Sequence, residues 1–97
     1  MSKFINVVKV KVKEVYKEEY LKKTKEMKRF KGLISSKTIE IGPNAYCFIG
    51  EWDSQTSYKA AYPQMIEHLN TIRSLLEEIS NELGVTDPSS GPIIIEQ

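Results

Sequence analysis

The sequence has a single cysteine, Cys47, among its 97 residues. One cysteine excludes an internal disulfide and any metal site built from several cysteines. No apolar run approaches the length needed to cross a membrane, and the N-terminal residues lack the apolar core of a signal peptide. These absences predict a cytoplasmic protein with no membrane partner.

An excess of one charge sign is also missing. The 14 lysines and arginines are balanced by 13 acidic residues, which leaves a net charge of +1, whereas a nucleic-acid binder usually carries a clear basic excess on one face. The sequence contains no phosphate-cradling glycine loop, dinucleotide fingerprint, nucleophile elbow or metal motif. It therefore gives no support for nucleic-acid binding, phosphoryl transfer, nicotinamide chemistry, serine hydrolysis or a resident metal.

Alternating apolar residues predict four strands. Residues 3–13 form the first, and residues 33–41 and Ala45–Trp52 form a hairpin around the turn at residues 42–44. Ile93–Glu96 forms a short final strand. The strand Ala45–Trp52 carries bulky side chains on both faces, so it needs a cover on each side, and a second copy of the protein is the simplest cover for one of them.

Helical spacing predicts two helical regions. The first covers residues 16–31. The second begins after the N-cap Ser54 as a short helix, Gln55–Tyr62, and Pro63 then opens a new segment that extends to Leu83, where a glycine ends it.

Residues 85–92 form a turn-rich connector before the final strand. The order of elements is strand, helix, strand, strand, helix, strand. That order predicts a single α+β domain over residues 1–97, with a ferredoxin-like antiparallel four-stranded sheet and two helices on one face.

Two polar residues interrupt apolar patterns. The only histidine, His68, lies three residues after Met65 and four before Ile72, inside the apolar stripe of its helix. Asn6 lies among the apolar positions of the first strand. A histidine can accept a proton near neutral pH, and an amide can stabilise developing negative charge. The alternative is structural, with both side chains hydrogen-bonded inside the core.

Three aromatic residues can form the wall of a site for a flat aromatic ligand: Trp52, Tyr58 and Tyr62. The tyrosines precede Pro63, and irregular helix ends often line clefts. The alternative for Trp52 is packing in the core at the end of its strand.

Several stretches together resemble the antibiotic biosynthesis monooxygenase family of dimeric α+β barrels. They are FINVVKVKV at residues 4–12, the strand CFIGEW with the polar cap DSQTS, the histidine-bearing helix, and the tail LGVTDPSSGPIIIEQ. The resemblance covers essentially the whole chain. It implies a homodimer in which two sheets pack face to face, with a pocket in each subunit between sheet and helices.

Some members of that family oxygenate aromatic polyketides or quinols without metal or flavin. Asn6 matches the asparagine of the family's first strand, and His68 falls in the helix where related members place a histidine. The resemblance thus implies a cofactor-independent monooxygenase for an aromatic or quinol-like molecule, with Asn6 and His68 as catalytic residues. The implied substrate wall consists of Trp52, Tyr58, Tyr62, Met65 and Ile72.

Two other hypotheses stay open. Haem-degrading relatives use asparagine, tryptophan and histidine together, but Trp52 lies in a strand rather than in the helix, which disfavours haem degradation. His68 alone could still ligate a haem iron, although a single histidine is a weak signal. A non-catalytic or stress-related dimer could instead use the same pocket to hold an apolar molecule. An open cavity that reaches both Asn6 and His68 would favour chemistry, and a filled core would exclude it.

Overall fold

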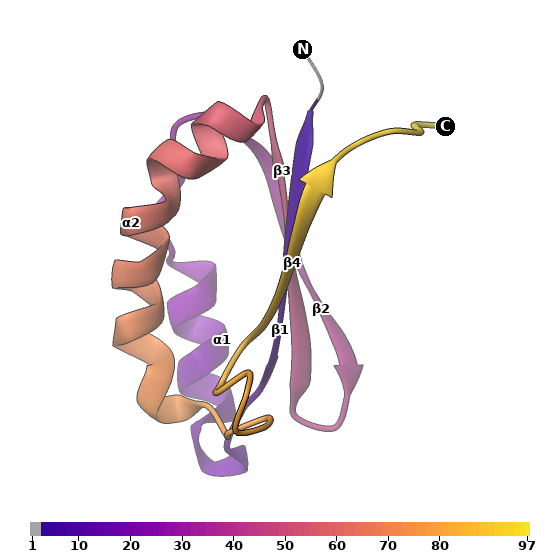
Figure 1. Ribbon diagram of the computed structural model, residues 1–97. Coiled ribbons are helices and arrows are strands. Elements are labelled where there is room, and N and C mark those ends of the chain that lie inside the picture. Colours follow the sequence, from indigo (N-terminus) through magenta and orange to yellow (C-terminus); the bar gives the residue numbers. More distant parts are fainter. Residues whose placement is uncertain (1–2) are drawn as a thin grey trace.

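The computed structural model describes residues 3–97, and two helices cover one face of its sheet (Figure 1). The strands are β1 (Phe4–Lys11), β2 (Leu33–Gly42), β3 (Ala45–Trp52) and β4 (Asp87–Pro92), and the helices are α1 (Lys17–Lys25) and α2 (Gln55–Ile72). The sheet order is β2-β3-β1-β4, and every neighbouring pair is antiparallel. This is the predicted ferredoxin-like α+β fold.

The two central strands, β1 and β3, pair along their whole length. Phe4 lies opposite Trp52, and Asn6 lies opposite Gly50. Because side chains alternate between the two faces of a strand, these four residues share the face that the helices cover. The β2–β3 turn contains Asn44 with a positive φ of 58°, a conformation that asparagine tolerates better than most residues.

Helix α1 is shorter than predicted. A 3-10 turn at Glu14–Tyr16 precedes it, and it ends at Lys25 rather than at residue 31. The remaining segment leaves the helix so that the buried Phe30 ring can stack on Trp52, with 6.2 Å between the ring centroids. Tertiary packing here overrides the local helical pattern.

Helix α2 is one continuous helix instead of two segments. Ser54 is its N-cap, as predicted, because the Ser54 hydroxyl accepts a hydrogen bond from the backbone N–H of Ser57 at 3.1 Å. Pro63 lies inside the helix, which is bent in Figure 1. A bend is expected where proline removes a backbone hydrogen bond.

The predicted extension of this helix to Leu83 is wrong. The helix ends at Ile72, and a 3-10 turn at Arg73–Leu75 leads into Leu76, which is extended and forms a β-bridge with Val12. Leu75 and Leu76 are thereby buried against the end of β1. The helical pattern could not reveal that the helix ends before them, because Leu75 and Leu76 also fit a helical stripe.

The final strand lies earlier in the chain than the sequence pattern predicts. Strand β4 is Asp87–Pro92, within the predicted connector, and the predicted strand Ile93–Glu96 lies beyond it. Proline is tolerated in an edge strand because half of the N–H groups there need no partner. Ile94 is 86% exposed, and Figure 1 shows this tail leaving the sheet.

The core beneath the helices is divided into two clusters of buried residues. One cluster comprises Val10, Val12, Tyr20, Tyr46, Ile72, Leu75 and Leu76. The other comprises Phe4, Phe30, Leu33, Trp52 and Ala61. Residues from both clusters line a cavity between the sheet and the helices.

Candidate functional site

The cavity has a volume of about 410 Å³ and is lined by side chains from β1, β3, β4, α1 and α2. Six of the residues predicted for the site line it: Asn6, Tyr58, Tyr62, Met65, His68 and Ile72. The fold thus brings the asparagine of β1 and the histidine of α2 to one space. The core at this place is not filled.

Trp52 does not line the cavity. It is fully buried, and its indole Nε1–H donates a 2.7 Å hydrogen bond to Asn6 Oδ1. Because the indole nitrogen is only a donor, this bond fixes which arm of the Asn6 amide faces Trp52. Within residues 3–97, no hydrogen bond uses the Asn6 Nδ2 group. Trp52 therefore orients Asn6 rather than forming part of the wall, and Nδ2 remains as a donor.

Gly50 leaves the space in which this pair meets. A Cβ atom on Gly50 would lie 2.6 Å from Asn6 Oδ1 and 3.1 Å from Trp52 Nε1. The first distance is shorter than any ordinary contact between such atoms. A glycine is therefore required beneath the Asn6–Trp52 hydrogen bond.

The surroundings of His68 lower the pKa of its imidazole and so favour the neutral form, which can accept a proton. Burial lowers the pKa of its imidazole below the usual value, and the positive charge of Lys23 on α1 lowers this pKa further. The imidazole is therefore neutral at pH 7. Because the unfolded chain binds this proton more readily, the contribution of His68 to stability is present above the unfolded pKa and is lost as the pH falls towards the folded pKa.

Removing the charge of Lys23 tests this arrangement. In Lys23→Met the pKa of His68 is expected to rise but to stay below its usual value, because burial, the larger cause, remains. The chain has one histidine, so one imidazole proton resonance can be followed by NMR against pH. Lys22→Met removes the neighbouring charge and should leave this pKa unchanged. An unchanged pKa in Lys23→Met would show that Lys23 does not act on His68.

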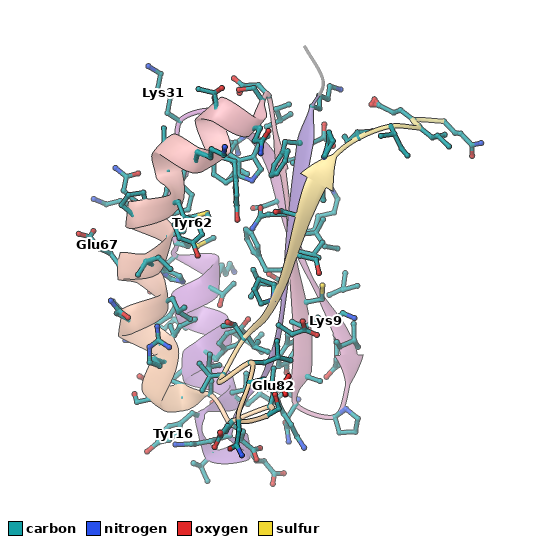
Figure 2. All side chains as sticks on the ribbon, viewed as in Figure 1. Lys9, Tyr16, Lys31, Tyr62, Glu67 and Glu82 are labelled. Carbon is teal, nitrogen blue, oxygen red and sulfur yellow. The ribbon has the colours of Figure 1, made fainter. Side chains whose placement is uncertain are left out.

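Two tyrosines of α2 lie at one end of the cavity. Tyr58 and Tyr62 are edge to face, with 6.0 Å between ring centroids. Burial and then the neighbouring Tyr62 raise the pKa of the Tyr58 phenol, so it stays protonated and can donate a hydrogen bond. Figure 2 shows Tyr62 on the side of α2 that faces the sheet and Glu67 on the opposite side.

Solved structures of the same fold cover nearly the whole chain. A protein of Chloroflexus aurantiacus, provisionally named an antibiotic biosynthesis monooxygenase, has a TM-score of 0.75 at 16% identity and covers 99% of this chain and 97% of its own. A protein of Nitrosomonas europaea with the same provisional name has a TM-score of 0.76 at 11% identity, with 96% and 91% covered. The chain shares the fold of these monooxygenase-named proteins.

A third structure, a dimeric ferredoxin-like protein from an uncultured marine organism, has a TM-score of 0.73 at 14% identity and covers 100% of this chain and 92% of its own. The sequence itself matches no protein-family model and no curated protein. At these low identities the likeness establishes the fold, and the resemblance to the antibiotic biosynthesis monooxygenase family is confirmed at that level.

Five polar residues of the cavity are not among the predicted site residues: Tyr20, Thr24, Thr86, Ser89 and Ser90. Tyr20 and Thr24 belong to the apolar stripe of the first predicted helix, so helical spacing could have identified them. Ser90 could not be found in this way, because its segment was predicted to be a connector. It pairs with Asn6 across β1 and β4.

Few side chains on the cavity wall are of the types that bind a metal. Over residues 3–97, no three His, Cys, Asp or Glu side chains gather as a metal site, and His68 is the one such residue on the cavity wall. The asparagine, tryptophan and histidine used by haem-degrading relatives do not all face the cavity, because Trp52 lies behind Asn6.

The described part of the chain has no helix long and apolar enough to span a membrane.

Proposed function

We propose that this protein is a small oxygenase that oxidises an aromatic or quinol-like molecule in the cavity between the sheet and the helices, without a resident metal or flavin. One observation carries the proposal: an apolar cavity holds a neutral imidazole and an amide whose Nδ2 group remains free to donate. The monooxygenase names of proteins with the same fold agree with it.

The proposed chemistry begins with proton transfer from the substrate to His68. The resulting anion is stabilised by Asn6 Nδ2 and the Tyr58 hydroxyl, which donate hydrogen bonds in a space of low polarity. The electron-rich anion then reduces dioxygen. For a methylene carbon between two aromatic rings, the products are a carbonyl group and one molecule of water, so the substrate supplies all the electrons.

Oxygen uptake tests the proposal directly. The purified protein, with no added metal or flavin, should consume oxygen in the presence of at least one member of a panel of hydroquinones and anthrones. The same panel should be followed by absorbance for binding. Saturable binding with no oxygen uptake would replace the oxygenase with the second function described below.

The second candidate is a carrier that binds the same class of molecule without changing it. The observation that favours it is the lack of an acidic residue on the cavity wall, because a catalytic imidazole is usually oriented by a hydrogen-bonded partner. A substrate oxygen could supply that partner in the oxygenase. The oxygen-uptake experiment separates the two functions.

We further propose a homodimer formed through the sheet face opposite the helices. Ile5, Val7, Ile39 and Ile49 lie on this face, where Ile39 is 46% exposed. An apolar face of this kind is typically covered by another copy, and a protein with the same fold is described as dimeric.

A charge on this face is expected to separate the subunits. Wild-type protein should sediment at twice the chain mass of 11.1 kDa. Ile49→Lys should sediment as a monomer, because the lysine charge would have to be buried in the interface. Val15→Lys adds a lysine at a residue that is 86% exposed outside the sheet and should remain dimeric. A monomeric wild-type protein would remove the barrel arrangement.

A further inference from the structure

A second cavity lies beside the first, between α1 and the strands β2 and β3. Its volume is about 580 Å³, and it shares Thr24, Met27 and Phe48 with the wall of the first cavity. The two cavities are therefore separated only by side chains, one of which is a flexible methionine. A ligand longer than the first cavity could extend into the second.

One buried hydroxyl group in the wall of the second cavity has no hydrogen-bond partner. Within residues 3–97, the buried Tyr46 hydroxyl oxygen forms no hydrogen bond. Tyr46 lines the second cavity and is only 4% exposed. Because buried polar groups in folded proteins are normally satisfied, this unsatisfied hydroxyl indicates a site for a polar ligand group.

The charges around the second cavity favour an anion. Three lysines line it, and the one acidic residue, Glu40, lies 4.0 Å from Lys17. Among the described residues Lys25, on α1, forms no ion pair. Lys37 pairs in register with Ile49, so its side chain belongs to the sheet face opposite the helices. The cavity rim therefore carries one unpaired positive charge, that of Lys25, near the Tyr46 hydroxyl.

We propose that the second cavity binds an anionic group, such as a carboxylate, of a ligand whose aromatic body occupies the first cavity. The Tyr46 hydroxyl donates to the anion, and Lys25 supplies the positive charge beside it. This inference rests on the proposed use of the first cavity, and it narrows the substrate class to aromatic acids.

A pair of fluorescent probes tests the inference. Anilinonaphthalene sulfonate and phenylnaphthylamine share the same aromatic body, but only the first carries an anionic group. The variant Lys25→Gln should weaken binding of the sulfonate probe about threefold, because one exposed charge is removed. Binding of the neutral probe should be unchanged. The control Lys28→Gln removes one charge outside both cavities and should affect neither probe.

Tyr46→Phe gives an independent test. It should weaken the sulfonate probe about tenfold, since a hydrogen bond to a charged group is lost, while the midpoint of thermal unfolding rises because an unsatisfied buried hydroxyl is removed. A merely structural Tyr46 would not give this combination.

Equal weakening of both probes, or unchanged sulfonate binding in these variants, would overturn the anionic site and leave the first cavity standing. If the wild-type protein bound neither probe, the proposed function would fail with it.

Discussion

Gly50→Ala is expected to lower the free energy of unfolding by about 3 kcal/mol, because the new methyl group overpacks the core and breaks a buried hydrogen bond. The added Cβ would lie 2.6 Å from Asn6 Oδ1, so the asparagine side chain has to move. The Trp52 indole N–H then loses its only acceptor in a fully buried position. Urea denaturation measures the change in stability.

A matched control is available on the edge strand. Gly91 of β4 has no atom within 4 Å of the position where its Cβ would stand. Gly91→Ala should therefore change the free energy of unfolding by no more than about 0.5 kcal/mol. The fluorescence of Trp52, the only tryptophan, should shift in Gly50→Ala alone. Equal stability losses in the two variants would mean that the close approach at Gly50 does not matter.

The prediction of the fold succeeded where local pattern and tertiary structure agree. The bounds of β3, the N-cap Ser54 and the turn at Asn44 follow from alternation, capping and turn preferences, all of which act over a few residues. Strand β4 could not be found in this way. Its prolines and serines lack strand propensity, and the segment becomes a strand because β1 offers a free edge.

The prediction of the site depended on the same distinction. The sequence pattern places Asn6 on the apolar face of a strand and His68 on the apolar face of a helix. Both apolar faces point towards the core, where they line one cavity. The hydrogen bond between Trp52 and Asn6 could not be predicted, because it requires the register of β1 against β3. From the sequence alone, Trp52 could either line the ligand site or pack in the core. The pairing of β1 with β3 places it in the core, bonded to Asn6.

His68→Ala is expected to give the largest loss of activity. If His68 is the base that accepts the substrate proton, its removal should lower kcat about 10²- to 10⁴-fold, the usual contribution of a positioned general base. Binding of the neutral probe phenylnaphthylamine should change little, since the apolar wall remains. Glu67→Ala changes the adjacent residue, whose side chain points away from the sheet (Figure 2), and should retain full activity.

The pH dependence makes the test specific for the imidazole. Because burial and then Lys23 lower the pKa of His68, the wild-type rate should rise with pH through this lowered pKa and be level at pH 7, where the base is neutral. Lys23→Met, which raises the pKa, should move the rising limb to higher pH. The residual activity of His68→Ala should lack that limb. A variant that kept the wild-type rate and the same limb would show that His68 is a core side chain and that the proton goes elsewhere, to water or to a group on the ligand itself.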